Sequence, residues 1–448
     1  MQRVPALLLL VSCLAAATPA AAAATLQVAP VPGALATAIA GASPGDVLVL
    51  QAGDHPGPIT LAFPLTLEGE PGARLTGGST GNTVTITGPG VTVRGLLISG
   101  SGDDATEISS GVFVSSTATS ARIENNHLSA NLHGITLHGA KDSLVTGNRI
   151  EGRQGGRVND RGNGIYVWNA PGTVVEGNDI RWGRDGIFAN ASKRNVFRNN
   201  RMSDLRFAVH YMYTNDSEIS GNVSIGNTLG FALMFSNKIK VTNNMSLGDR
   251  RHGLMLNYAN NAVVTGNLVR GGLTEKCTFI YNAHKNLISG NRFEGCQIGV
   301  HFTAGSERNI ISGNAFVANQ NQVKYVGTRH VEWSDGGRGN YWSDHAAFDL
   351  NGDGIADSPF RPNDLMDHIL WSQPAAKLLL GSPAVQLVRW SQESFPAILP
   401  GGVTDSAPLT RALSIPVSPE LAALEQRALA EARNRTETDE DPDNLTTH

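Results

Sequence analysis

The sequence predicts an all-β protein, a right-handed parallel β-helix built from coils of about 22 residues. A Gly-Asn or Asn-Asn pair recurs nine times, and its second residue advances by 22, 30, 22, 22, 22, 23, 24 and 23 positions. The pairs are Asn125-Asn126, Gly147-Asn148, Gly177-Asn178, Asn199-Asn200, Gly221-Asn222, Asn243-Asn244, Gly266-Asn267, Gly290-Asn291 and Gly313-Asn314. About eight residues after each pair, an alternating apolar strand begins, as in Gly230-Phe231-Ala232-Leu233. A coil of this length cannot bury its own apolar face, so neighbouring coils must complete the core.

The composition agrees with this fold and narrows the possible partners. The chain has 50 Gly residues and only 17% charged residues, a balance typical of turn-rich β proteins. Its formal net charge is −4, and it contains no basic stripe with interleaved aromatic residues, so we expect no nucleic-acid partner. Leucine-rich repeats share the period, but their Leu spacing is missing here.

Each part of a coil has a local physical reason. Gly and Asn tolerate the left-handed backbone conformation that a sharp corner requires, and stacked Asn side chains can bond to one another along the stack. A further short strand precedes each Asn, as at Ser143–Thr146. Ala34–Ala40 is expected to form a helix that caps the first coils, and the regular array is expected to end near Asn340. We therefore predict a β-helix domain over residues 25–371.

The first 24 residues are typical of an export signal. Arg3 supplies a positive start, Ala6–Ala17 is a short apolar run, and the Ala-rich stretch ending near Ala24 offers cleavage sites. Leu10–Cys13 also resembles a lipidation motif, which leaves a lipid anchor as the alternative. No other run approaches the ~18 apolar residues that a membrane span requires, so the mature protein is expected to be soluble outside the cytoplasm.

One coil step of 30 residues indicates an insertion of about eight residues at Glu151–Asn163. The insertion carries Arg153, Arg157 and Arg161. Insertions in solenoids protrude as loops on one face, often a binding face, although a merely tolerated loop is equally compatible with the pattern.

A group of methionine residues predicts a metal-binding patch. With the coils aligned on their Asn residues, His210, Met212, Met234 and Met255 point outward on three successive strands. Strands lie about 4.8 Å apart and alternate residues about 6.6 Å apart, so these side chains can share an exposed patch. Thioether sulfur with imidazole selects Cu(I) over hard ions, whereas the alternative is that Met fills gaps in a core. His252 flanks this patch, and His284 and His301 are outlying candidates that are expected to be surface histidines instead.

Two further motifs leave alternatives open. Cys277 and Cys296 are a disulfide, two inert thiols or a pair of soft metal ligands. A second motif has the oxygen-ligand spacing with which a calcium loop begins, but Phe360 stands where the bidentate carboxylate belongs. Its residues are Asp349, Asn351, Asp353, Ile355 and Asp357. They predict either a structural Ca²⁺ or Mg²⁺ site or a tight turn without an ion.

The repeat is lost beyond residue 371, and residues 372–448 are predicted to be a docking tail. Its apolar residues alternate with Pro and Ser, and Ser418-Pro419 opens a helix expected near 419–435. The residues expected to contact a partner at the membrane surface are Trp371, Leu378, Leu379, Leu387, Trp390, Phe395, Leu421 and Leu424. The alternative is that the tail packs back on the β-helix. The end, Glu437–His448, is acidic and polar and is expected to be disordered.

Taken together, these motifs resemble the NosD family, periplasmic β-helix proteins needed for the maturation of nitrous oxide reductase. The strongest matches are Gly339–Asp344, which runs into the Asp349–Asp357 loop, and the coils from Tyr211 to Gly305. The resemblance covers nearly the whole mature chain. Wider relatives, including carbohydrate-active β-helices, share the Gly-Asn coil and the Asp/Gly loop.

The resemblance implies a periplasmic accessory protein that is peripheral to the inner membrane. Its partners would be the membrane subunit of an ABC transporter with its cytoplasmic ATPase, a membrane-anchored copper chaperone that delivers Cu(I), and apo nitrous oxide reductase. The chain has no phosphate-binding Gly-rich segment of its own, so the energy would have to come from the partner ATPase. The chain itself is expected not to be an enzyme.

Two other classes of function remain as alternatives. A lyase, hydrolase or epimerase acting on uronate polysaccharides would need convergent carboxylates, but Asp103-Asp104 is an isolated pair in an irregular loop. Elsewhere, Asp160, Asp179, Asp185 and Asp204 occur singly. A passive binding module or adhesin would bind no metal and would not need its tail.

Overall fold

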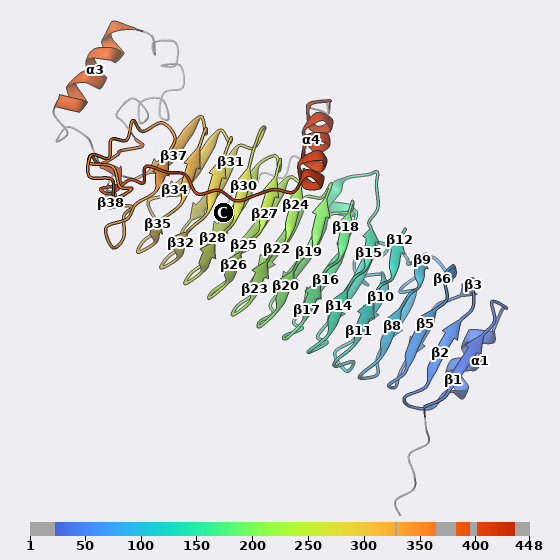
Figure 1. Ribbon diagram of the computed structural model, residues 1–448. Coiled ribbons are helices and arrows are strands. Elements are labelled where there is room, and N and C mark those ends of the chain that lie inside the picture. Colours follow the sequence, from blue (N-terminus) through green and yellow to red (C-terminus); the bar gives the residue numbers. More distant parts are fainter. Residues whose placement is uncertain (1–22, 328, 364–381, 395–400, 435–448) are drawn as a thin grey trace, which may run out of the picture.

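A computed structural model describes residues 23–327, 329–363, 382–394 and 401–434. Within these ranges the chain forms a long stack of coils, with the earliest coils at one end and the latest at the other (Figure 1). Three sheets of 13, 13 and 12 strands run along the stack, and successive coils pair in parallel in each of them. The predicted parallel β-helix is confirmed.

Each regular coil contributes one strand to each sheet. Sheet A contains β1 (Thr25–Val28), β2 (Val47–Leu50), β5 (Thr66–Gly69), β8 (Thr92–Arg94), β11 (Arg122–Glu124), β14 (Leu144–Thr146), β17 (Val174–Glu176), β20 (Val196–Arg198), β23 (Glu218–Ser220), β26 (Lys240–Thr242), β29 (Val263–Thr265), β32 (Leu287–Ser289) and β35 (Ile310–Ser312). Sheet B contains β3 (Gly53–Pro56), β6 (Ala73–Thr76), β9 (Leu97–Ser99), β12 (His127–Ser129), β15 (Arg149–Glu151), β18 (Asp179–Arg181), β21 (Arg201–Ser203), β24 (Val223–Ile225), β27 (Met245–Leu247), β30 (Leu268–Arg270), β33 (Arg292–Glu294), β36 (Ala315–Val317) and β39 (Tyr341–Trp342). Sheet C contains β4 (Ile59–Leu61), β7 (Val84–Ile86), β10 (Ser110–Val114), β13 (His133–His138), β16 (Ile165–Trp168), β19 (Asp185–Asn190), β22 (Phe207–Met212), β25 (Leu229–Met234), β28 (His252–Asn257), β31 (Lys276–Tyr281), β34 (Ile298–Thr303) and β37 (Asn321–Val326).

The core runs through the middle of the stack, between the three sheets. In sheet C the inward positions Val209, Phe231 and Leu254 lie at one register, and all three side chains are buried. Apolar residues stacked in this way exclude water along the whole axis, which is why no coil is stable by itself.

The Asn residues of the repeat form the ladder that the sequence predicts. Asn222 is fully buried, and its Nδ2 donates to Oδ1 of Asn244 at 3.0 Å and to the carbonyl oxygen of Phe197 at 2.8 Å. The residue before each of the nine repeat Asn residues, from Asn126 to Asn314, has positive φ, as at Gly221 (63°) and Asn243 (56°). In each pair, therefore, the first residue forms the left-handed corner and the second, the buried Asn, forms the hydrogen-bonded ladder.

One helix covers the first end of the stack, and a returning chain segment covers the other. The helix α1 (Ala34–Gly41) packs against the first coils and buries Leu35. At the other end β38 (His330–Glu332) pairs with β40 (Gly402–Thr404), and the Asp405 carboxylate accepts hydrogen bonds from the Asn340 amide and the Trp342 indole. Asp405 thus ends the asparagine ladder by supplying the acceptor that the next coil would have provided.

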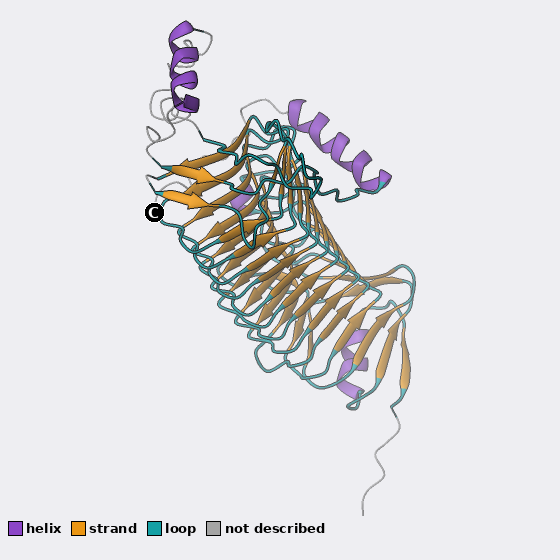
Figure 2. Ribbon diagram, turned by 60° about the vertical axis from the view of Figure 1, so that its left-hand side comes forward, coloured by secondary structure: helices purple, strands orange, loops and turns teal. Residues whose placement is uncertain are grey.

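The tail returns along the outside of the coils. After β40 the chain runs back to α4 (Pro419–Asn434), which lies outside sheet B beside β24, β27 and β30 (Figures 1 and 2). Leu421 and Leu424 pack there against Ile225, Leu247 and Leu268. Where it is described after residue 400, the tail therefore follows the alternative of packing back on the β-helix.

The remaining helical segments are short. The inserted loop contains a 3₁₀ turn, η1 (Val158–Asp160), and the tail contains α3 (Pro383–Ser394). None of the helices in the described ranges is long and apolar enough to cross a membrane.

Candidate functional site

The predicted metal ligands lie on the outer face of sheet C in the register expected from the sequence. His210 pairs with Ala232, and Ala232 pairs in turn with Met255. Met212 pairs with Met234 in the next column. Ala232 lies between His210 and Met255, whose backbones are two strand spacings, about 10 Å, apart. We call His210, Met212, Met234 and Met255 the Met/His patch.

The Met/His patch is less exposed than the sequence suggested. His210 is 7% exposed and Met255 is 6% exposed, while Met212 and Met234 are half-buried. Met255 packs with Phe207, Leu229 and Ala232 on the outer face, and Met234 packs against this cluster. Large apolar neighbours on the same face therefore turn an exposed patch into a sheltered one, where an ion would lose most of its contact with water.

His210 is held by a buried carboxylate that the sequence analysis missed as a site residue. Asp185 is fully buried, and its Oδ2 lies 3.3 Å from Nδ1 of His210. Arg206 donates to both carboxylate oxygens of Asp185, at 2.9 Å each. Burial alone would raise the pKa of Asp185, but the His210 hydrogen bond and the Arg206 charge lower it well below its usual range.

The ionised Asp185 sets which ring nitrogen of His210 carries the proton. A carboxylate only accepts hydrogen bonds, so Nδ1 of His210 must be the donor. Nε2 of His210 is buried and has no hydrogen-bond partner. In the neutral ring Nε2 therefore presents its lone pair on the outer face of sheet C, the face that also carries Met212, Met234 and Met255.

Two more histidines on this face also have unpartnered ring nitrogens. Nδ1 of His252 and Nδ1 of His301 are buried without partners, on either side of the Phe279 ring. Burial, together with the charge of Lys276, lowers the pKa of each to about 3. Both rings are therefore neutral at pH 7, and His301 is part of this sheltered face rather than a plain surface histidine. His284 is different, because its Nδ1 accepts a hydrogen bond from the main-chain amide of Glu307.

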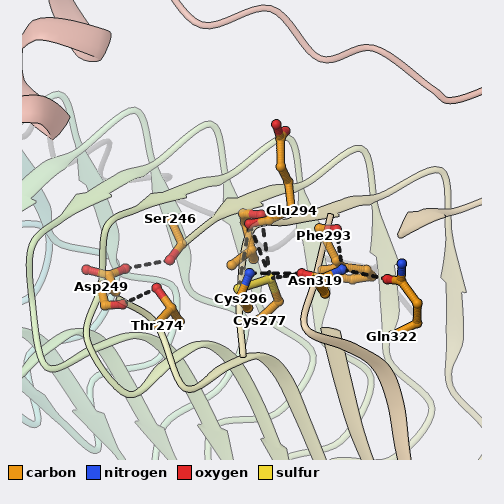
Figure 3. Close-up of a disulfide and its surroundings, with 10 residues drawn as sticks. Ser246, Asp249, Thr274, Cys277, Phe293, Glu294, Cys296, Asn319 and Gln322 are labelled. Atoms are coloured by element: carbon orange, nitrogen blue, oxygen red, sulfur yellow. Dashed lines mark hydrogen bonds between the residues drawn. A yellow bond between two sulfur atoms is a disulfide. The ribbon is translucent and has the colours of Figure 1, made fainter. Parts of the chain in front are cut away.

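The cysteines form a disulfide. The sulfur atoms of Cys277 and Cys296 are 2.05 Å apart, and both residues are buried in the core, where they link successive coils (Figure 3). The soft-ligand alternative for this pair is wrong, because a disulfide offers no thiolate to a metal. Figure 3 also shows Asp249 close by, bound by the hydroxyl of Ser246 at 2.6 Å.

The Asp349–Asp357 loop folds around its own carboxylates. Asp349 accepts hydrogen bonds from the main-chain amides of Gly352, Asp353 and Gly354, and Asp357 accepts one from Leu350. Asn351 Nδ2 donates to Asp353, and the amide of Ile355 also donates to Asp353. In the ranges that the structure describes, no group of three or more His, Cys, Asp or Glu side chains is placed to hold a metal ion. The Ca²⁺ or Mg²⁺ site stays a prediction.

The predicted docking residues of the tail fall into three sets. Leu387 (64% exposed) and Trp390 (60% exposed) lie on α3 and face solvent. Leu421 and Leu424 pack on sheet B, so they are not free to contact a partner as Leu387 and Trp390 are. The predictions for Trp371, Leu378, Leu379 and Phe395 lie outside the described residues.

Comparisons with known proteins place the chain among copper-binding periplasmic proteins. The family described as "Periplasmic copper-binding protein (NosD)" matches residues 152–347. A relative from Stutzerimonas stutzeri is 42% identical over 375 residues, which cover 81% of this chain and 86% of the relative. A relative from Pseudomonas aeruginosa is 40% identical, with 81% and 87% covered. Both are named "Probable ABC transporter binding protein NosD", a name for a binding protein and not for an enzyme.

Solved structures are similar to this chain in fold only. An exopolygalacturonase of family 28 from Yersinia enterocolitica superposes with a TM-score of 0.54, at 12% identity, over 65% of this chain and 73% of the enzyme. At this level of identity the likeness shows a shared β-helix, and it says nothing about activity.

Proposed function

This chain belongs to the NosD family of periplasmic copper-binding proteins, and from that premise we propose that it helps an ABC transporter to assemble the copper sites of nitrous oxide reductase. In this proposal the protein is not itself catalytic. It receives Cu(I) as cargo from a membrane-anchored chaperone on the Met/His patch and passes it to the apo reductase.

One observation carries the proposed copper site. Nε2 of His210 is buried, unpartnered and fixed in direction by Asp185, and it lies on the same face as three methionines. Imidazole and thioether together favour Cu(I) over hard divalent ions. A buried lone pair without a hydrogen-bond partner costs free energy, so an incoming soft ion would relieve that cost.

The sheltered position of the patch suits transfer better than storage. Neutral thioether ligands leave the charge of Cu(I) uncompensated, and the apolar neighbours Phe207 and Leu229 do not offset it. Binding would therefore be reversible, as handover between proteins requires.

Contacts with the transporter would come from the tail. Leu387 and Trp390 expose large apolar side chains, and their three-residue spacing places them next to each other on one face of α3, which favours contact with a partner. We propose that these two residues contact the membrane subunit, whose cytoplasmic ATPase would supply the energy that this chain cannot provide.

An anaerobic Cu(I) titration of the full mature protein against a chromogenic chelator tests the copper site. The test variant replaces His210 with Ala and Met212, Met234 and Met255 with Leu. The control variant is Met245→Leu, because Met245 is also partly buried but lies on sheet B, in the cluster that α4 covers. The proposal expects tight binding by the wild type and by the control, and loss of binding in the test variant. Equal binding by all three proteins, or no binding by the wild type, would refute it.

A further inference from the structure

The carboxylate of Asp185 is at the centre of a bonded group that connects the Met/His patch with the inserted loop. Arg206 binds Asp185 through two parallel hydrogen bonds, and Nε of Arg184 lies 3.6 Å from the same carboxylate. His210 completes the group through Nδ1. The buried carboxylate is strongly ordered, because Arg206 and His210 hydrogen-bond to oxygen lone pairs that water cannot reach, and Arg184 adds a second positive charge nearby without a hydrogen bond.

The inserted loop holds both of these arginines. Asn159, within η1, accepts a hydrogen bond from Nη1 of Arg206 at 2.9 Å. Asn163, at the end of the loop, accepts one from Nε of Arg184 at 3.2 Å. The backbone takes part as well, since the amide of Arg184 donates to the carbonyl oxygen of Gly162 at 2.6 Å. The residues that lengthen one coil by about eight positions are therefore the residues that orient the two guanidinium groups.

We infer that Asp185 is a positioning residue that holds His210 with Nδ1 protonated and Nε2 open to Cu(I), and that the inserted loop Glu151–Asn163 keeps Asp185 in place through Arg184 and Arg206. The inference rests on the proposed copper function of the Met/His patch. It assigns a role to the loop that the repeat itself does not require.

The chemistry of a metal-binding imidazole supports this role. Only the nitrogen without a proton can donate a lone pair to a metal, and in water a free imidazole exchanges its proton between both nitrogens. A carboxylate on Nδ1 fixes the proton there, fixes the ring plane and increases the basicity of Nε2. Residues that support metal ligands in this way typically change metal affinity by about 10- to 100-fold when they are replaced.

A matched pair of variants separates positioning from general destabilisation. Asp185→Asn removes the ionised acceptor. Asp179→Asn is the control, because Arg201 binds Asp179 with the same two-bond geometry across one coil step, but on sheet B and without a histidine. Both variants remove one Arg–Asp ion pair between neighbouring coils, but the Asp179 side chain is 41% exposed whereas Asp185 is buried. Urea unfolding of both variants therefore measures their loss of stability separately, and the histidine signal and the Cu(I) affinity are compared under conditions in which both variants are folded.

The first measurement uses the apoprotein, so that it does not depend on copper binding. Selective ¹⁵N labelling of histidine, with His210→Gln to assign the signal, reports which ring nitrogen carries the proton. We expect the Nδ1–H form of His210 in the wild type and in Asp179→Asn, and a shift toward the Nε2–H form in Asp185→Asn. A wild-type His210 that carries its proton on Nε2 would overturn the inference, even if the protein binds copper.

The second measurement is the Cu(I) titration of the same proteins. We expect the affinity to fall by about 10- to 100-fold in Asp185→Asn and to stay within about threefold in Asp179→Asn. Arg206→Lys is a second variant that keeps the charge but cannot form the two-bond geometry, and it should weaken binding in the same direction. Unchanged affinity in both Asp185→Asn and Arg206→Lys overturns the inference while leaving the copper site intact. Absence of binding by the wild type refutes the proposed function instead.

Asn159→Ala tests the part played by the loop. If the loop holds Arg206, this variant should reduce Cu(I) affinity less than Asp185→Asn does, with a mixed protonation pattern on His210. Wild-type affinity and an unchanged histidine signal in Asn159→Ala would show that the loop does not act through Arg206.

Discussion

Replacement of Asp249 by Asn should change how the stability of the protein depends on pH. Asp249 is fully buried, and its Oδ2 accepts hydrogen bonds from the hydroxyls of Ser224 and Ser246, each at 2.6 Å. The amide of Asn227 donates to the other oxygen. Burial raises the pKa of Asp249 from 3.8 to about 6, although these donors oppose the rise.

The direction of the effect follows from this raised pKa. The folded protein holds the proton of Asp249 up to about pH 6, whereas the unfolded chain releases it near pH 4. Between these values the folded state binds more protons, so the free energy of unfolding falls as the pH rises. At 1.36 kcal/mol per unit, a rise of about two units corresponds to ~3 kcal/mol that is present below pH 4 and lost by about pH 7.

The assay is urea unfolding of the wild type and Asp249→Asn at several pH values from 4.5 to 7.5. His133, with a pKa lowered by burial to about 4, and the similar His252 and His301 act in the opposite direction. Their contributions are the same in both proteins and cancel in the difference. The variant should therefore gain stability relative to the wild type as the pH rises, whatever constant offset the new amide introduces.

The test is how the difference in the free energy of unfolding between Asp249→Asn and the wild type changes with pH. A difference that rises by about 2–3 kcal/mol over the range supports a buried, late-ionising Asp249. Parallel curves for the two proteins would refute the reasoning, because they would mean that Asp249 ionises in the folded protein as it does in the unfolded chain.

Three other predictions concern the stability of the coils and the tail. Asn222→Ala should lower the free energy of unfolding in urea by about 3 kcal/mol or more, because several buried partners lose their hydrogen bonds. Asn243→Gly should leave it nearly unchanged, since other coils carry Gly at that left-handed corner. Equal losses in the two variants would contradict a stabilising role of the asparagine ladder. Replacing Cys277 and Cys296 together by Ser should cost about 3 kcal/mol in unfolding measured without reductant, and no loss would argue against the cross-link. Leu429→Asp should release α4 and open the tail to limited proteolysis while circular dichroism of the β-helix is kept, since Leu429 is buried against the coils near Gly248 and Gly272; an uncleaved tail would mean that other contacts hold the helix.

The sequence predicted those parts of the fold that repeat. The left-handed corners, the asparagine ladder and the inward and outward phases of sheet C all follow from a period near 22, because the same contact recurs between each coil and the next. For the same reason the outward phase of His210 and Met255, and their separation by Ala232, follow from the repeat alone. The pattern did not show that the outer face of sheet C is sheltered from water. Phe207 and Leu229 pack there with Met255, although the alternation of inward and outward residues did not place them on that face.

The contacts between repeating and non-repeating segments were decided only by the tertiary structure. Asp185 was one of several single Asp residues in the sequence, and only the fold brings Arg206, His210 and the inserted loop around it. Asp405 reaches Asn340 over 65 positions, and Glu425 reaches Arg270 over 155. Such pairings have no period, because they depend on where an irregular chain segment returns to the stack. The physical reason is that local backbone preferences and burial recur along a solenoid, whereas the charge and hydrogen-bond partners of a unique segment are known only once that segment has been placed in space.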